Sequence, residues 1–315
     1  MLVTNETDLR RVGTGTNGWK ISAYYRQTAD ILLTSDWTSI GRQGSNVIYF
    51  TGIYDGGGFY IADLKIPSTS PGLSSYQGLF AYNSGTVKNV ALRNVNINCS
   101  SFNDVGGIAG YNFSNGIIEN CYVAGSIGGG FYVGGITGSN AGIIRNCYST
   151  SGVMGLNYAG GIAGRNSGAS ARVEFCYATK AIILAGSNGG GGIVGNNGSG
   201  STIQRCVALN TQIMNTIANT TLGRVTGVNA GTLTANYALF DMSVWYYTGS
   251  TFGNAPQTIG QNSKDGANIS STDYNSTSWW TSTFLTSTNW SFATNRLPWL
   301  KTTTGVTFPG QTPEM

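Results

Sequence analysis

The sequence predicts an all-β chain folded as a β-solenoid of about eight coils, with a cap at each end. Three observations indicate this. The segment GIAGYN at residues 107–112 has counterparts at regular intervals, and a block such as IENCYV follows each copy. The repeated units are rich in Gly, Asn and β-branched residues and show no sustained 3.6-residue period. Because one such unit cannot bury its apolar face alone, we expect the units to stack.

Composition excludes several classes of function. Only 10% of the 315 residues are charged, the net charge is +4, and the Lys and Arg residues are scattered. This pattern does not favour nucleic-acid binding. The chain has no His, which removes Ser-His and Cys-His nucleophiles, and its five Cys form no CxxC pair. We therefore expect no metal, no cofactor and no nucleic-acid partner.

Residues 1–45 are predicted to form an N-terminal cap with the segment that leads into the coils. The first residues, MLVTNETDLRR, lack the apolar stretch of a signal peptide, and no run of 18 apolar residues occurs. We expect no membrane insertion. The segment is expected to be cut from a longer precursor or to be exported without a signal peptide.

Residues 46–240 are predicted to be the β-helix repeats. Six aligned units end in asparagine, at intervals of 26 to 32 residues. These are Asn83, Asn112, Asn140, Asn166, Asn197 and Asn229. A propeller blade would need about 40 residues, and leucine-rich repeats would need their Leu/Asn consensus. The spacing favours one solenoid coil per unit, with these asparagines in a column.

A bend is expected at Asn120, because strict alternation along IIENCYV cannot turn both Ile118 and Cys121 inward. Asparagine tolerates the left-handed conformation of such corners, and its amide can bond the next coil. Asn89, Asn120 and Asn146 are therefore predicted to form a short corner ladder. The later coils do not continue it, because Phe175, Arg205 and Ala235 stand at the equivalent positions.

With that bend, the cysteines stack inward below Val90 as compact apolar residues. The column consists of Cys121, Cys147, Cys176 and Cys206. We interpret them as reduced, buried thiols, with a metal or redox role as the alternative. The outward position two residues earlier alternates in charge between coils, which favours this register. It is occupied by Lys88, Glu119, Arg145, Glu174, Gln204 and Thr234.

A tyrosine follows the cysteine position in most coils and is predicted to face solvent. Tyr122, Tyr148, Tyr177 and Tyr237 form this stripe, which Val207 interrupts. Aromatic faces bind sugars and other amphipathic surfaces, so the stripe is the candidate binding site. The alternative is that the rings only stack between coils and stabilise the sheet.

Residues 241–301 are predicted to form an aromatic-rich C-terminal cap, an apolar lid over the last coil; a ligand groove is the alternative. Their large aromatic residues include Trp245, Tyr246, Tyr247, Trp279, Trp280, Trp290 and Trp299. Residues 302–315 are expected to be a tail.

At these residues the chain resembles the GLUG-motif family of bacterial surface proteins, through "GGIAGYN...NGIIENCYV" and "GGITGSNAGIIRNCYS". Residues 24–41, 50–66 and 290–300 are similar to the family's first and last segments, although an asparagine and a histidine would be expected at Gly57 and Phe59. The resemblance implies a right-handed β-helix from a secreted or surface-anchored bacterial protein, often an adhesin or the accessory region of a protease. No catalytic residues belong to the motif.

The sequence favours a non-catalytic adhesion or binding module at the cell surface or outside the cell, a rigid rod presenting a polar and aromatic face. Its expected partner is a surface glycan or a host or cell-surface protein, and self-association stays open. One alternative is a carbohydrate-active lyase or hydrolase, which needs clustered acids. Only Asp104, Glu119 and Glu174 supply acids between residues 100 and 240. A viral fibre or tailspike is the other alternative.

Overall fold

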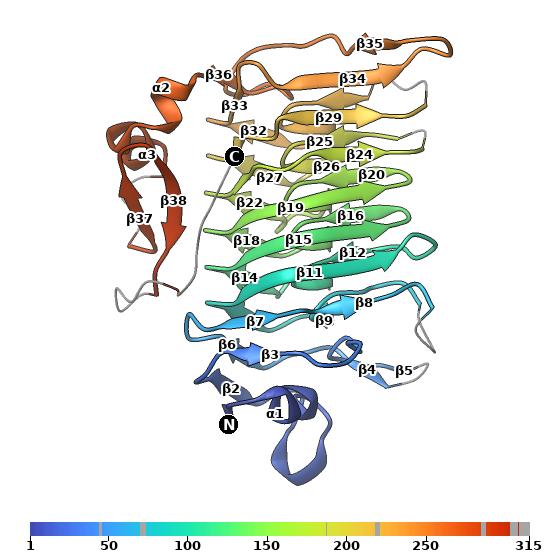
Figure 1. Cartoon of the computed structure of the whole chain (residues 1–315), viewed down its shortest axis with the longest axis vertical. Coiled ribbons are helices and arrows are strands. Elements are labelled where there is room, and N and C mark those ends of the chain that lie inside the picture. The colour runs from blue at the N-terminus through green and yellow to red at the C-terminus, as the bar shows by residue number, and fades with distance from the viewer. Residues whose placement is uncertain are drawn as a thin grey trace.

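Short strands of two to nine residues form the rod in Figure 1, a computed structural model. The structure describes residues 1–43, 46–69, 74–186, 188–217, 221–284, 288–302 and 308. Over this part of the chain, parallel strands stack into about eight coils. The predicted β-solenoid is therefore confirmed.

Each central coil adds one rung to sheets that we name A, B, C and D, in the order in which the chain visits them. Sheet A consists of β1 (Leu2–Val3), β2 (Tyr24–Gln27), β6 (Ile53–Asp55), β10 (Thr86–Lys88), β14 (Ile117–Glu119), β18 (Ile143–Arg145), β22 (Arg172–Glu174), β27 (Thr202–Gln204) and β32 (Thr232–Thr234). The strands of sheet A are rich in β-branched residues, which favour extended backbone. The main path of sheet B consists of β3 (Ile31–Leu32), β7 (Tyr60–Ala62), β11 (Ala91–Cys99), β15 (Tyr122–Gly129), β19 (Tyr148–Gly155), β23 (Tyr177–Ala178), β28 (Val207–Ala208), β33 (Tyr237–Leu239) and β36 (Ala267–Ile269). Beside this path lie β8 (Lys65–Ile66), β24 (Ile182–Leu184), β29 (Gln212–Asn215), β34 (Ser243–Tyr247) and β35 (Phe252–Asn254).

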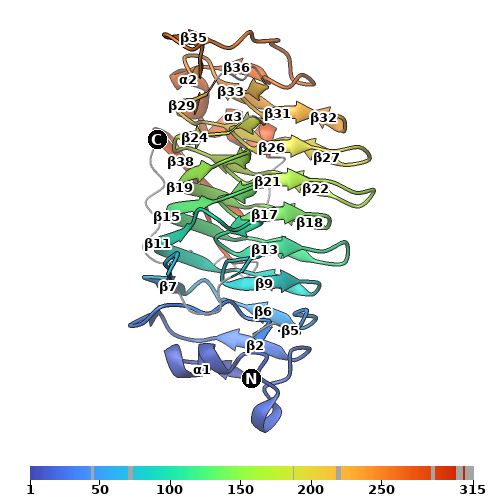
Figure 2. The ribbon, with the colours of Figure 1, turned by 90° about the vertical axis from the view of Figure 1, so that its right-hand side faces the viewer.

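Sheets C and D complete the coil, and Figure 2 shows the rungs of sheet D one above another. Sheet C consists of β12 (Val105–Gly106), β16 (Tyr132–Gly134), β20 (Tyr158–Gly160), β25 (Gly190–Gly191) and β30 (Leu222–Gly223). Sheet D consists of β9 (Phe80–Asn83), β13 (Ala109–Asn112), β17 (Thr137–Asn140), β21 (Ala163–Asn166), β26 (Val194–Asn197) and β31 (Thr226–Asn229).

The remaining elements lie at the two ends of the chain. They are α1 (Glu6–Arg11), a 3-10 turn at Thr16–Gly18, the hairpin β4 (Arg42–Gln43) and β5 (Asn46–Val47), α2 (Ser271–Tyr274), α3 (Thr277–Thr283), and the hairpin β37 (Trp290–Ala293) and β38 (Arg296–Leu300). Helix α1 begins at Asn5, whose Oδ1 accepts a hydrogen bond from the amide of Asp8 at 3.0 Å. Among the described residues, no helix has both the length and the apolar character needed to span a bilayer.

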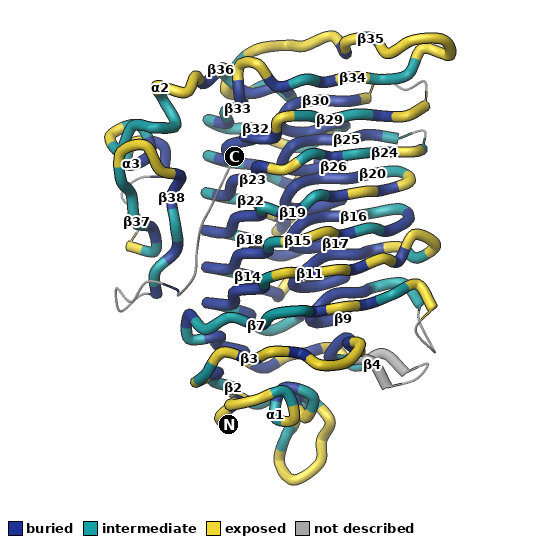
Figure 3. Tube along the Cα trace, viewed as in Figure 1, coloured by how far each residue is buried: buried dark blue, intermediate teal, exposed yellow. Residues whose placement is uncertain are grey.

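The core is built from columns of equivalent apolar residues, and Figure 3 shows the rungs largely buried. Ile108, Ile136 and Ile162 form one such column between sheets C and D. The amide of each donates to the carbonyl of the next, at 2.9 Å in both steps. All three side chains are fully buried. Equivalent residues therefore lie directly over one another, as the repeat predicts.

The charged column on sheet A lies in the predicted register. Lys88 pairs with Glu119, Glu119 with Arg145, and Arg145 with Glu174. The Arg145 guanidinium lies 2.6 Å from the Glu119 carboxylate. Because both side chains are partly exposed, such a contact contributes about 0.2 to 1 kcal/mol. Its main effect is to fix which residues face each other.

The corner between sheets A and B has the left-handed backbone that the sequence predicts. The φ angles of Asn89, Asn120 and Asn146 are 54°, 52° and 50°. Asn120 also donates from Nδ2 to Oδ1 of Asn89 at 3.2 Å. In the later coils the corner keeps this backbone without asparagine, at Phe175, Arg205 and Ala235. Coil stacking therefore imposes a conformation that costs L-residues about 1 kcal/mol or more.

The cysteines behind this corner are buried, free thiols. Cys121 donates from Sγ to the carbonyl of Glu119 at 3.2 Å, and Cys147 makes the same contact with Arg145. Burial raises the pKa of the Cys121 and Cys176 thiols. These two thiols therefore stay protonated at neutral pH and pack as small apolar side chains.

A continuous ladder of asparagine amides runs along the corner between sheets D and A. Each Nδ2 donates to Oδ1 of the next, at 2.7 to 2.9 Å, from Asn83 through Asn112, Asn140, Asn166 and Asn197 to Asn229. Asn140 also donates to the carbonyls of Gly142 at 3.0 Å and Arg172 at 3.2 Å. The amide therefore joins the end of one strand to the start of another in the next coil.

The coils extend beyond residues 46–240. Strand β2 already pairs with β6 in sheet A, and β36 still pairs with β33 in sheet B. The aromatic-rich C-terminal segment differs in part from the expected lid. Figure 1 shows β34 and β35 at the end of the rod, whereas α2, α3, β37 and β38 lie alongside it. Most of the expected tail, residues 302–315, lies outside the described residues; Thr302 and Phe308 are described, and both are buried.

We predict that Asn140→Ala destabilises the rod by about 3 kcal/mol, because it removes the buried acceptor of Asn112 Nδ2 and the buried donor to Asn166 Oδ1. Asn229→Ala is the matched control, since Asn229 ends the ladder and is exposed. Denaturant unfolding midpoints measure both changes. Equal shifts in the two variants would contradict a cooperative buried ladder.

We also predict that Ala235→Gly stabilises the protein by up to about 1 kcal/mol, because glycine adopts the positive φ at this corner without strain. Ala124→Gly in β15, where φ is not positive, should instead destabilise by about 0.5 to 1 kcal/mol. Thermal unfolding of the two variants tests the opposite signs. A loss of stability in Ala235→Gly would show that the corner is not strained.

Candidate ligand-binding surface

The tyrosines that follow the cysteines form the column on sheet B that the repeat predicts. Tyr122 pairs with Tyr148, Tyr148 with Tyr177, and Val207 then separates Tyr177 from Tyr237. The first three rings stack almost parallel, with centroids 5.0 and 4.9 Å apart. Stacking between coils therefore occurs as expected.

The expectation that this stripe faces solvent is wrong. Tyr122, Tyr148 and Tyr177 are at most 3% exposed, and Tyr237 is partly buried against Trp279. The cover is the C-terminal strap, which we define as the described residues of 271–302. Figure 1 shows it along the side of the rod.

Large aromatic residues attach the strap to the stripe. The Trp290 ring lies 6.2 Å from Tyr148 and 5.7 Å from Tyr177, and its Nε1 donates to Oδ1 of Asn146 at 3.2 Å. The Tyr177 hydroxyl donates to the carbonyl of Pro298 at 2.6 Å. A column of outward rings is a large apolar surface, and the strap removes it from water.

A different aromatic surface is open to solvent, on sheets C and D. Its first cluster follows one column along sheet D from Tyr49 to Tyr82 and Tyr111, flanked by Tyr76 and Phe113. Neighbouring ring centroids lie 4.2 to 6.2 Å apart, and the six pairs are all tilted or edge-on. Tyr49 is 45% exposed and Tyr82 only 6%, while the other three rings are partly exposed.

A second cluster of rings lies further along the same side of the rod, near the start of the sheet C strands. Tyr132 and Tyr158 stack with centroids 5.5 Å apart and an angle of 14° between the rings. Phe131 contacts both rings edge-on, at 4.9 and 5.7 Å. Arg165 from sheet D lies over the Tyr132 ring at 5.4 Å. All four side chains are partly exposed.

Polar residues separate the two clusters. On sheet D, Ser139 lies between Tyr111 and Arg165 and pairs with both. Asp104, just before strand β12 of sheet C, lies beside Ser139. The Ser139 hydroxyl donates to Oδ1 of Asp104 at 2.5 Å. We name the two clusters together with Asp104, Ser139 and Arg165 the tyrosine face.

Burial raises the pKa of the Asp104 carboxyl to about 6, since the residue is only 7% exposed. The hydrogen bond from Ser139 and the charge of Arg165 act in the opposite direction. Asp104 also has a φ of 56°, which Asp tolerates better than most residues. It is therefore a carboxylate held below the surface between two groups of rings.

Sequence reasoning missed the tyrosine face, although a signal was present. Tyr82 and Tyr111 stand directly before ladder asparagines, at an outward position of sheet D. Tyr132 and Tyr158 begin the strands before the paired glycines of each unit. Neither column is continuous, because Asp104, Ser139 and Arg165 interrupt the aromatic pattern.

The acids considered for catalysis lie apart on the coil. Glu119 and Glu174 belong to sheet A, with Arg145 paired between them, whereas Asp104 precedes β12 of sheet C. Within the described ranges, no group of three His, Cys, Asp or Glu residues could hold a metal ion. Of the three acids that the sequence offered, Glu119 and Glu174 are thus separated by a rung that carries a cation, and Asp104 lies by another sheet, which is not the carboxyl pair of a glycosidase.

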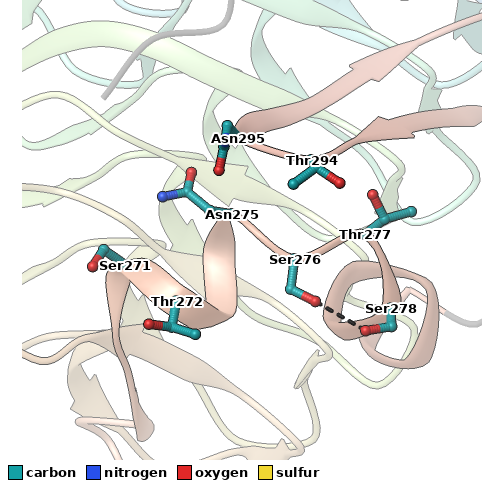
Figure 4. Close-up of a pocket in the computed structure, with 8 residues that line it drawn as sticks. All are labelled: Ser271, Thr272, Asn275, Ser276, Thr277, Ser278, Thr294 and Asn295. Atoms are coloured by element: carbon teal, nitrogen blue, oxygen red, sulfur yellow. Dashed lines mark hydrogen bonds between the residues drawn. The ribbon is translucent and has the colours of Figure 1, made fainter.

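A separate hollow of about 650 Å³ lies on the strap (Figure 4). Its lining consists of Ser271, Thr272, Asn275, Ser276, Thr277, Ser278, Thr294 and Asn295. The Ser276 and Ser278 hydroxyls lie 2.9 Å apart, and the amide of Asn295 donates to the carbonyl of Asn275 at 2.9 Å. Every lining residue is neutral, and the hollow contains no aromatic platform.

Comparison with known proteins supports the family resemblance and the fold. The GLUG motif matches residues 103–128, a span that includes Asp104 and Tyr111. Among solved structures, the chain is similar to a protein from Bacteroides ovatus described as a "putative immunoglobulin A1 protease". The two are 24% identical, with a TM-score of 0.76 over 95% of this chain and 91% of that one. The comparison with curated proteins gives no match.

We predict that Asp104→Asn changes how stability depends on pH. The folded protein keeps the Asp104 proton up to about pH 6, whereas the ordinary value is 3.8, so ionisation destabilises the folded state as the pH rises between these values. The asparagine cannot ionise and still offers an acceptor to Ser139. The free energy of unfolding of the variant, relative to that of the parent, should therefore rise by about 1 to 3 kcal/mol from pH 4 to pH 8.

Unfolding measured at several pH values tests this expectation. Ser139→Ala should move the loss of stability to higher pH, because the Ser139 hydrogen bond lowers the Asp104 pKa. Parallel pH profiles for all three proteins would show that Asp104 is not a buried carboxyl in the folded protein.

Proposed function

We propose that this β-solenoid, which carries a GLUG motif, is a non-catalytic binding module that recognises glycans through the tyrosine face. The observation that supports the proposal is the pairing of exposed rings with hydrogen-bonding groups on one rigid surface. Sugar rings have apolar C–H faces and hydroxyl edges, and binding sites combine aromatic surfaces with a few placed polar groups for such ligands. Tyr111 and Tyr132 supply rings here, and Arg165, which lies over the Tyr132 ring, supplies hydrogen-bond donors.

The rigidity of the rod also supports a binding role. Tyr82, Tyr111, Tyr132 and Tyr158 lie on strands whose positions are fixed by the neighbouring coils. Little side-chain and backbone freedom is then lost when a ligand binds, which favours affinity. By contrast, the rings that the sequence put forward on sheet B are already occupied by the strap.

We place the module at a cell surface or outside the cell, with a surface glycan as its first partner and a surface protein as the alternative. The GLUG resemblance and the low content of charged residues favour this location. A cysteine or a Ser-His peptidase mechanism would need an activated side-chain nucleophile. The thiols of this chain are buried in the core, and it has no His to activate a serine.

We predict that Tyr111→Ala and Tyr132→Ala each weaken glycan binding at least 10-fold, because each removes a ring from the face. The measurement is binding of the full chain to a glycan array, followed by titration of the ligands found. Phe240→Ala is the control, since Phe240 is 67% exposed but lies at the C-terminal end of sheet B. It should leave binding unchanged.

Thermal unfolding must first show that the variants are folded. If the parent protein bound no glycan on the array, the proposal would be contradicted. Binding that Tyr111→Ala and Tyr132→Ala leave intact would contradict it as well.

A further inference from the structure

The tyrosine face is long and narrow, with its long direction along the rod. On sheet D, Tyr49, Tyr82, Tyr111, Ser139 and Arg165 occupy five successive rungs of one column. Successive rungs of a sheet lie about 4.8 Å apart, so four steps span about 19 Å. A ligand that contacts both ring clusters must therefore be an extended chain and not a single terminal sugar.

The two clusters present different groups to such a chain. Tyr132 and Tyr158 stack almost parallel, so each covers a face of the other. In the first cluster Tyr49 is steeply inclined to its neighbours, at 64° to Tyr82 and 89° to Phe113, whereas Tyr111 and Phe113 are inclined by 44°. Rings at such angles cannot cover each other's faces fully, and Tyr49 is the most exposed of them. The first cluster therefore offers apolar contact surface to the ligand.

Arg165 gives the second half of the face a positive charge. Its guanidinium lies over the Tyr132 ring, and Nη2 donates to the Ser167 hydroxyl at 3.3 Å. In the described part of the chain, no carboxylate lies within ion-pair distance of it. Asp104, the acid of the face, is buried and accepts from Ser139. An anionic ligand at the surface can therefore contact the Arg165 guanidinium, whereas the Asp104 carboxyl lies beneath the surface. Guanidinium groups bind carboxylate or sulfate strongly.

We propose that the tyrosine face binds a linear acidic polysaccharide that lies along the rod, with sugar faces on the Tyr49–Tyr111 cluster and an anionic group on Arg165. This inference rests on the proposed glycan-binding function and names its ligand class. The aromatic contacts supply apolar surface, and the charge-assisted hydrogen bonds of Arg165 select an acidic chain over a neutral one.

The test compares acidic polysaccharides with neutral forms of the same backbone. Polygalacturonate, alginate and hyaluronan are each titrated beside their carboxyl-reduced counterparts, with the full chain and at low and high salt. At least one acidic form should bind 10-fold or more tightly than its reduced counterpart, and added salt should narrow the difference. Arg165→Gln should abolish the preference without abolishing binding to the reduced form.

Chain length is tested with oligosaccharides of the preferred acid, from two to six units. Affinity should rise until the chain spans the face, and Tyr49→Ala should remove most of the gain between short and long chains. Tyr24→Ala is the matched control, because Tyr24 is 48% exposed but belongs to sheet A.

The outcomes separate this inference from the function on which it rests. Equal affinity for acidic and reduced forms, or for two and six units, would overturn the linear acidic ligand. If neutral glycans on the array still required Tyr111, glycan binding itself would stand. If the protein bound none of the polysaccharides and no glycan on the array, both the acidic ligand and the glycan-binding function would be overturned.

Discussion

The whole rod depends on equivalent residues stacking in register from one coil to the next. Parallel strands pair their amides and carbonyls only where the neighbouring coil repeats the same path. Extra residues must therefore be absorbed at corners: residues 141–142 join sheets D and A in one coil, and residues 167–171 in the next. Asn140 accommodates this difference, because its amide still reaches the carbonyl of Arg172. The asparagine ladder thus keeps sheet A in register although the coils differ in length.

The same stacking explains why the corner between sheets A and B changes its residues along the rod. Phe175 and Arg205 keep the left-handed backbone although asparagine would adopt it more easily. Phe175 packs edge-on against Phe284, and Arg205 donates to the carbonyl of Thr283 at 3.2 Å. These contacts offset the backbone strain, so the corner both turns the chain and attaches the strap.

Sequence reasoning succeeded where contacts repeat and failed where they occur once. The pairing of Glu119 with Arg145, the bend at Asn120 and the burial of Cys121 all follow from comparing neighbouring units. The contact of Trp290 with Asn146 joins residues 144 positions apart, and within the described residues no other corner asparagine contacts a tryptophan in this way. No periodic pattern encodes it, which is why the tyrosine stripe was expected to be exposed. The interrupted columns of the tyrosine face escaped attention for a related reason.

The two aromatic surfaces differ in whether polar groups interrupt them. On sheet B the covered column consists of neutral rings and aliphatic residues, and the strap satisfies the Tyr177 hydroxyl with the carbonyl of Pro298. On the tyrosine face, a similar cover would have to remove water from Arg165 and from the region around Asp104. Removing water from the Arg165 guanidinium and the Asp104 carboxyl costs free energy that offsets the gain from burying the rings. The polar interruption therefore opposes closure by the chain itself and favours a ligand that brings its own hydrogen-bonding and anionic groups.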